Sequence, residues 1–236
     1  MEIMNGLKSK TNKLFGGLAA AALILASCGS GEEQSTITTS VTAGETTAAP
    51  ATTAATAPVE ETQPAPPEGA VVIGNIALDV PEDWASVTKG GDFEAALAEK
   101  NPAILGVLEA QGTLEQVKLV ATQVDWVAVP PEGGVINLVV APAAQANTAV
   151  DDVALGLRQT IEARGFTVTS EDPVTTKLGS GLSVKIATTT PTGIAGAAES
   201  IIIDGEDNLM IFTADGLTAA DVSAQLQTVI DFTTTS

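Results

Sequence analysis

The sequence changes character at Gly69, and this boundary limits which part of the chain can fold. Residues 29–68 contain 10 Thr, 8 Ala, 6 Glu, 5 Pro and 3 Ser, with no aromatic residue and only Ile37, Val41 and Val59 as larger aliphatic side chains. A segment of this composition buries too little apolar surface to offset the conformational entropy lost on ordering it. We therefore expect a disordered tether before Gly69 and one folded domain over residues 69–236, a normal length for a single domain.

The first residues have the layout of a secretory signal peptide. Lys8, Lys10 and Lys13 precede an uninterrupted apolar run over residues 14–26. A helix of this length covers roughly 20 Å, which is shorter than the ~30 Å hydrocarbon core of a bilayer. The pattern predicts a signal peptide over residues 1–27 that is removed, and not a membrane-spanning helix.

A cysteine directly after the apolar run specifies the type of signal peptide. Leu25-Ala26-Ser27-Cys28 resembles the lipobox of bacterial lipoproteins, in which the cysteine becomes the first mature residue and carries the lipid. The alternative is an ordinary small buried cysteine. The resemblance implies that Cys28 is the lipid (palmitate-type) attachment site, that residues 28–68 form the tether, and that the protein is anchored in the cell membrane facing outside the cytoplasm.

The composition excludes several kinds of chemistry. The chain has no His and a single Cys, so the usual His/Cys zinc sites, Ser-His and Cys-His catalytic pairs and intrachain disulfides cannot form. Its formal charge of −19 disfavours nucleic-acid binding, which depends on basic residues that neutralise phosphates. We expect no cofactor, no metal and no nucleic-acid partner.

Apolar periodicity and turn residues predict both helices and strands in the domain. Four helices are expected, over residues 92–100, 102–110 (capped by Asn101), 150–164 (opened by Thr148 and Asp151) and 219–231 (opened by Thr218 and Asp221). Strands are expected over residues 71–80 (one strand, or a hairpin about Gly74-Asn75), 118–129, 135–141, 166–170, 182–189, 198–204 and 208–213. The predicted fold class is α+β, an α/β/α sandwich around an antiparallel sheet.

The order of these elements resembles the PsbP-like fold family. The resemblance covers most of residues 75–233 and includes a long helix that ends at Gly165. Its motif-like parts are the Pro-x-x-Trp entry within Val80-Pro81-Glu82-Asp83-Trp84 and the Asp231-Phe232 exit. The family includes a photosystem II extrinsic subunit, a Ran-binding (Mog-type) import factor and LpqN-type lipoproteins. It implies an antiparallel sheet between helices, used for docking and not for catalysis, and it supplies no catalytic residues.

Two tryptophans are the candidate contact residues. Trp84 and Trp126 are two of only seven aromatic residues, and a large aromatic side chain can anchor a partner. Each also lies in or beside a predicted strand, where a large apolar residue usually belongs to the core. Both interpretations stay open from the sequence.

The sequence favours a non-enzymatic, lipid-anchored binding or docking module whose partner is another envelope protein or a cell-wall component. One alternative is an envelope hydrolase that uses two carboxylates, which would require two buried Asp or Glu side chains facing each other in a cleft. Acidic pairs occur at Glu82-Asp83, Asp151-Asp152, Glu171-Asp172 and Glu206-Asp207, where turn and cap roles are expected. A second alternative is a small-molecule or lipid carrier with a deep apolar cavity.

Overall fold

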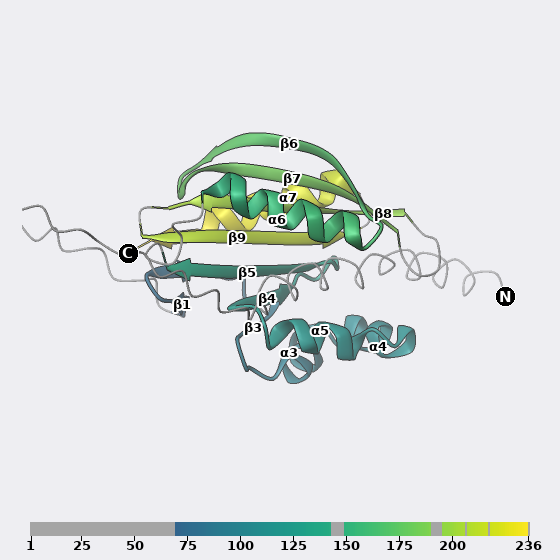
Figure 1. The fold of residues 1–236 in the computed structure, drawn as a ribbon. Helices are drawn as coiled ribbons and strands as arrows, with labels where there is room; N and C mark the ends of the chain where they lie inside the picture. Colours follow the sequence, from purple (N-terminus) through teal and green to yellow (C-terminus); the bar gives the residue numbers. More distant parts are fainter. Residues whose placement is uncertain (1–68, 143–148, 190–194, 206, 217, 236) are drawn as a thin grey trace, which may run out of the picture.

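The computed structural model describes residues 69–142, 149–189, 195–205, 207–216 and 218–235 (Figure 1). The signal peptide, the tether and Cys28 lie outside the described residues. Among the helices in the described part, none is both long and apolar enough to cross a bilayer.

A seven-stranded antiparallel sheet forms the centre of the domain. Its strand order is β3-β4-β5-β9-β8-β7-β6, and every neighbouring pair is antiparallel. The strands are β3 (Ala85–Thr88), β4 (Trp126–Val129), β5 (Val135–Pro142), β6 (Thr167–Thr176), β7 (Gly179–Thr189), β8 (Ala195–Asp204) and β9 (Asn208–Gly216). The predicted antiparallel sheet is therefore confirmed, and strands β6 to β9 follow one another in it as a meander.

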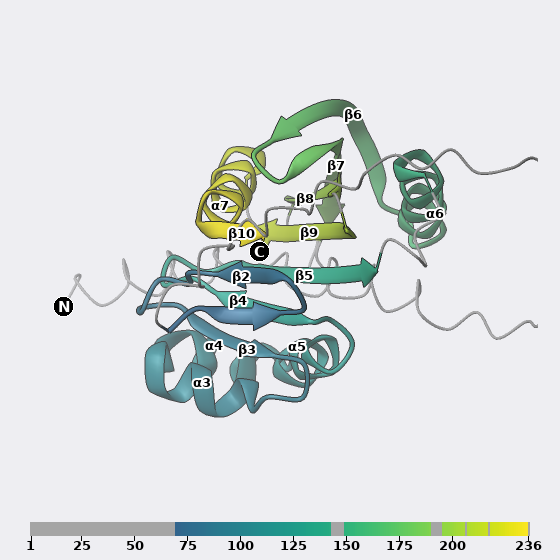
Figure 2. The same ribbon diagram turned by 90° about the vertical axis from the view of Figure 1, so that its left-hand side faces the viewer.

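Helices cover both faces of this sheet. One face packs against α3 (Phe93–Lys100), α4 (Pro102–Gln111) and α5 (Leu114–Ala121) at the β3–β5 end, and against α6 (Val150–Ala163) at the β6–β8 end. The opposite face packs against α7 (Ala219–Phe232). Figure 2 shows α6 and α7 on opposite sides of the twisted half of the sheet. The α+β prediction, with helices on both faces of an antiparallel sheet, is confirmed.

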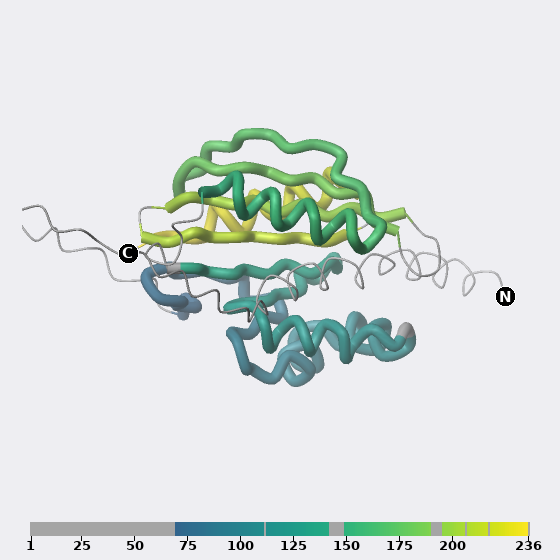
Figure 3. Tube along the Cα trace, viewed as in Figure 1, coloured from purple at the N-terminus to yellow at the C-terminus, as the bar shows by residue number. Residues whose placement is uncertain are grey.

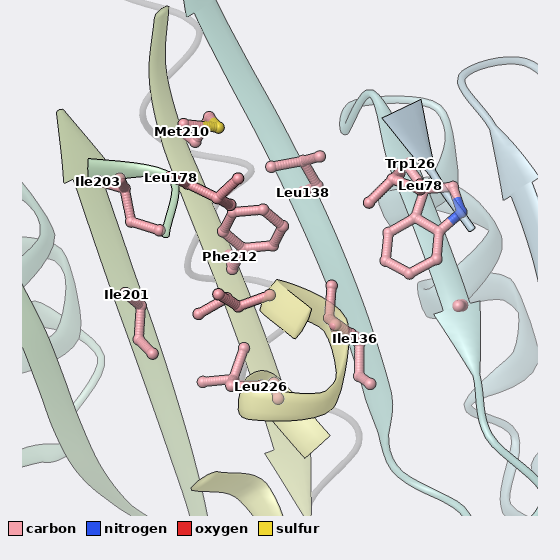
Figure 4. Close-up of a cluster of buried hydrophobic side chains, with 14 of the residues drawn as sticks. Leu78, Trp126, Ile136, Leu138, Leu178, Ile201, Ile203, Met210, Phe212 and Leu226 are labelled. Atoms are coloured by element: carbon pink, nitrogen blue, oxygen red, sulfur yellow. The ribbon is translucent and has the colours of Figure 1, made fainter. Parts of the chain in front are cut away.

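Fully buried side chains fill the space between the sheet and α7. Phe212 and Ile136, from β9 and β5, lie beside Leu226 of α7 in this cluster (Figure 4). These residues follow the strand period of two, because Ile136 and Leu138 face α7 while Val135 and Val139 face the other helices. Burial of this apolar surface is the main source of stability.

The two ends of the domain meet in a small second sheet. β1 (Val71–Ile73) and β2 (Ile76–Leu78) form a tight hairpin, as one of the two sequence interpretations proposed, and β2 also pairs with β10 (Thr233–Thr235). Figure 3 shows how the beginning and the end of the described chain run together there. Strand β10 has no counterpart in the sequence prediction.

The largest error in the sequence prediction is at residues 118–121, which belong to helix α5 and not to a strand. Leu114, Val117 and Val120 lie three residues apart and are buried, which is a helical spacing that the high valine content obscured.

Lys118 of α5 forms ion pairs with Glu94 of α3 at 2.9 Å and with Glu115 at 3.0 Å. Hydrogen bonds to these two carboxylates raise the pKa of Lys118 above its usual value.

Three of the predicted helix ends can be compared with the structure. The Thr218–Asp221 start of α7 is confirmed, since the Asp221 backbone N–H donates to the Thr218 hydroxyl at 3.2 Å. Asn101 does not cap α4 through its side chain, because its amide donates to the carbonyl of Pro130 instead, at 3.4 Å. Helix α6 begins with Ala149 as its N-cap, which has no side-chain acceptor, and Thr148 lies outside the described residues.

Strand β6 is longer than predicted and runs through the Glu171-Asp172 pair, which the sequence placed in a turn. Pro173 also lies within it, and this is tolerated because β6 is at the edge of the sheet, where a missing N–H breaks no ladder. Glu171 is held by the Arg158 side chain of α6, with a distance of 2.7 Å from Nε to Oε1. This hydrogen bond raises the pKa of Arg158.

Candidate functional site around Trp84

Trp84 lies where the small sheet, the large sheet and α7 come together. Its backbone N–H donates to the carbonyl of Pro81 at 3.0 Å, which closes the turn before β3. Its ring meets Phe232 of α7 edge to face, with centroids 5.7 Å apart and an interplanar angle of 81°. The side chain is only 7% exposed, yet it lines two surface clefts, one with a volume of about 460 Å³ and one of about 410 Å³.

The first cleft lies between α7 and the turn that joins β4 to β5. The turn contributes Glu132, Gly133 and Gly134, and α7 contributes Asp221 and Gln225, with Trp84 also in the lining. We call this space the α7 cleft. Glu132 and Asp221 are exposed carboxylates, so the cleft carries negative charge.

Gln225 ties the two walls of the α7 cleft together. Its Nε2 donates to the carbonyl of Gly133 at 2.9 Å, and the residue is 8% exposed. Its second amide atom, Oε1, is buried and accepts no hydrogen bond from the described residues. A buried acceptor without a donor is unfavourable, and a donor that reached it would recover this free energy.

Gly134 allows this close approach. Its φ is +90°, and a Cβ built there would lie 2.7 Å from the carbonyl oxygen of Asp215 and 3.0 Å from Oε1 of Gln225. Any other residue at Gly134 would therefore strain the backbone and push the turn away from β9 and α7. The Gly133-Gly134 pair is a requirement of the cleft as well as of the hairpin.

The second cleft lies on the other side of Trp84, beside the first residues of the domain. It is lined by residues that include Gly69, Pro81, Ser86 and, from α3, Glu99 and Lys100. Lys100 and Glu99 form an ion pair at 3.3 Å. Glu82 adds a second carboxylate to this lining. Because Lys100 offsets one of the two carboxylates, this cleft is less acidic than the α7 cleft.

The structure separates the two tryptophans that the sequence selected. Trp126 has no exposed surface and packs in the core beside Leu78 (Figure 4), which favours the core interpretation for this residue. Trp84 fits both the core and the contact interpretation, since it is mostly buried but borders both clefts. Cys28, the predicted lipid site, is not among the described residues.

The buried carboxylates do not have the geometry of a hydrolase pair. Glu199 of β8 and Asp215 of β9 are 5% and 1% exposed. Asp215 is opposite Ala198 and Glu199 is opposite Ala214 in the register, so the two carboxylates point to opposite faces of the sheet. Glu199 faces α7 and accepts hydrogen bonds from the hydroxyls of Ser183, at 2.6 Å, and of Ser223.

Two of the acidic pairs singled out in the sequence lie at a helix start and in a turn. Asp151 and Asp152 lie in the first turn of α6, where they complement the helix dipole, and Glu82-Asp83 lie in the turn before Trp84. Glu206 is not described. In the described part of the chain, no three Asp, Glu, His or Cys side chains are grouped so that they could hold a metal ion.

Sequence reasoning missed Gln225 and the role of Glu132. Gln225 lies among the predicted helical residues 219–231 and has no feature that distinguishes it from a solvent-facing glutamine. The only signal was Gly133-Gly134, two adjacent glycines in a hairpin turn, which indicates that another part of the chain comes close.

No family model matches the sequence, and no curated protein matches it significantly. Among solved structures, the chain is similar to cyanobacterial PsbP (CyanoP) from Synechocystis sp. PCC 6803, with 10% sequence identity and a TM-score of 0.39 over 69% of this chain and 87% of that chain. It is also similar to PA94, a protein of unknown function from Pseudomonas aeruginosa, with 11% identity and a TM-score of 0.33 over 67% of this chain and 88% of that one.

Proposed function

We propose that this chain is a non-enzymatic lipoprotein, held in the cell membrane through Cys28, whose folded domain binds another envelope protein or a cell-wall component outside the cytoplasm. The signal-peptide and lipobox patterns support the location. The observation that carries the binding function is the α7 cleft, a space of about 460 Å³ that brings together an aromatic side chain, two carboxylates and a buried amide from three separate parts of the chain.

The arrangement of this cleft suits recognition better than hydrolysis. Its carboxylates, Glu132 and Asp221, are exposed, whereas a general acid needs burial or a neighbouring charge that raises its pKa. The buried carboxylates, Glu199 and Asp215, lie on opposite faces of the sheet and cannot act on one bond from both sides. The α7-facing core is occupied by apolar side chains, which favours a surface partner over a lipid held inside the domain.

A site-specific photocrosslink in living cells tests this proposal. A benzophenone amino acid is placed at Thr228, an exposed position on the wall of the α7 cleft, and at Glu109, an exposed position on α4, as the matched control. We expect ultraviolet light to join the full-length protein to one defined envelope component from position 228 and not from position 109. Equal yields from both positions, or none from position 228, would contradict a binding role for this cleft.

A further inference from the structure

The α7 cleft contains hydrogen-bond acceptors, and its described lining has no basic side chain to neutralise them. Glu132 and Asp221 contribute carboxylates, and none of the described residues that line the cleft is a lysine or arginine. One oxygen of Asp221, Oδ2, accepts a hydrogen bond of 2.6 Å from the Thr218 hydroxyl, which leaves the second oxygen for a ligand. A ligand that enters this space therefore meets negative charge that is not neutralised within the wall.

The buried amide adds a directional requirement. Gln225 uses its N–H on the carbonyl of Gly133, so the group that remains is Oε1, an acceptor. A ligand that satisfies it must donate a hydrogen bond. The carboxylates and the amide oxygen are thus all hydrogen-bond acceptors. A positively charged group with several N–H donors would satisfy them.

We propose that the α7 cleft binds an arginine side chain presented by a basic partner polypeptide. This proposal rests on the binding function proposed above and specifies its chemistry. A guanidinium group carries five donors in a plane, pairs with carboxylates through two N–H groups at once and loses less hydration than an ammonium group. It also stacks on aromatic rings, and Trp84 supplies one in the cleft wall.

The charge of the whole domain agrees with a basic partner. Residues 69–236 contain 22 acidic and seven basic side chains, a formal charge of −15. Such a field attracts a cationic polypeptide before contact is made, and it excludes acidic ones.

The other accessible surfaces give weaker support for a binding site. The second cleft beside Trp84 already contains Lys100 paired with Glu99. The free edge of β6 is poorly suited to an added strand, because Pro173 has no N–H to donate to it and the register shift between Val168 and Ser170 makes the strand irregular. Among the surfaces formed by the described residues, the α7 cleft is the one that combines volume, unneutralised charge and an unsatisfied buried acceptor.

The test uses the full-length lipidated protein in detergent micelles, labelled with ¹⁵N, at low salt. Three blocked pentapeptides with glycine at every position except the centre are titrated, with arginine, lysine or citrulline in the middle. Citrulline has nearly the shape of arginine without its charge. We expect the arginine peptide to shift the side-chain amide signal of Gln225 and the indole N–H signal of Trp84 in a saturable way, the lysine peptide to bind several-fold more weakly, and the citrulline peptide to produce no shift.

A matched pair of variants separates the cleft from the general negative field. Glu132→Gln removes one carboxylate from the cleft, and Glu109→Gln removes one exposed carboxylate on α4. We expect Glu132→Gln to weaken arginine-peptide binding about three-fold, within the range measured for single exposed ion pairs, and Glu109→Gln to leave it unchanged. Thermal unfolding curves of both variants control for folding.

Three results would overturn the proposal: no saturable shift with the arginine peptide, equal binding of the citrulline peptide, or equal weakening by Glu132→Gln and Glu109→Gln. A crosslink from position 228 together with any of these results would show that the cleft binds a partner through other chemistry. Failure of the crosslink would instead contradict the binding function itself.

Discussion

Trp84 and Phe232 join the beginning and the end of the domain through an edge-to-face contact with ring centroids 5.7 Å apart. Trp84 precedes the first strand of the large sheet, and Phe232 is the last residue of α7. Directly after Phe232 the chain enters β10 and pairs with β2. The contact therefore holds α7, the small sheet and the wall of the α7 cleft in a fixed relation.

Replacing Phe232 by alanine should loosen this junction. The change removes a half-buried ring and its aromatic partner contact, so we expect a loss of about 2 kcal/mol in the free energy of unfolding, measured by urea denaturation of the full-length protein. Phe232→Leu keeps most of the apolar volume and should lose less. Equal stabilities of the alanine variant and the wild type would mean that β10 alone holds the end of the chain.

Glu199 should be required for the docking of α7 on the sheet. Its buried carboxylate accepts hydrogen bonds from Ser183 on β7 and Ser223 on α7. In Glu199→Ala the buried Ser183 hydroxyl and the partly buried Ser223 hydroxyl lose their acceptor, so we expect a destabilisation of about 2 kcal/mol, while Glu199→Gln keeps one acceptor oxygen and should cost less.

The matched control for Glu199 is Glu109→Ala on the exposed surface of α4, which should change stability by less than about 0.5 kcal/mol. Guanidinium unfolding curves of the three variants compare them directly. An equal effect of Glu199→Ala and Glu109→Ala would show that the two serine hydrogen bonds contribute nothing to the docking of α7.

Two glycine substitutions should act in opposite directions. Gly134→Ala places a Cβ 2.7 Å from the carbonyl oxygen of Asp215 at a φ of +90°, so we expect a loss of more than about 1 kcal/mol. Gly106→Ala, in helix α4, meets no atom within 4 Å and should gain about 0.5–1 kcal/mol from helix propensity. Melting temperatures that move in the same direction for both variants would contradict the steric requirement for glycine in the β4–β5 turn.

Local patterns in the sequence predicted most of the fold but not the site. Ile136, Leu138 and Phe212 belong to segments with strand periodicity, and Leu226 belongs to a helix with a clear apolar face, so both elements were visible in the sequence. Helix α5 was not, because valine-rich residues 117–120 fit either period over so short a length. Strand β10 consists of three threonines, and its pairing with β2 depends on a contact more than 150 residues away in the chain.

The α7 cleft was unpredictable for the same reason. Gln225 and Gly133 are 92 residues apart and meet only because α7 packs across the β4–β5 hairpin. The acceptor left on Gln225 follows from which of its amide atoms faces Gly133, and no periodicity contains this information. Trp84 was selected from the sequence because tryptophan is rare here, but the sequence alone did not separate it from Trp126.

The packing face of α6 supports a paired prediction on two leucines of the same helix. Leu157 is 3% exposed and faces the sheet, whereas Leu155 is 45% exposed. Leu157→Asp introduces an unpaired charge into the core and should unfold the domain, while Leu155→Asp should leave the melting temperature within a few degrees of the wild type. Circular dichroism melts of the two variants distinguish them, and similar melts would mean that the packing face of α6 is assigned incorrectly.

Lipid attachment at Cys28 is the prediction on which the proposed location depends. Cells grown with an alkyne-bearing palmitate should incorporate the label into the wild-type protein, and Cys28→Ala should abolish labelling, because the chain has no other thiol for the lipid. Two or three acyl chains at about 0.8 kcal/mol per buried CH₂ hold a protein stably in a bilayer, so the wild type should resist extraction by high salt and alkali. Cys28→Ser serves as the control for size and polarity and should also remain unlabelled. A label that persists in both variants would place the lipid on another residue and remove the basis for a lipobox at residues 25–28.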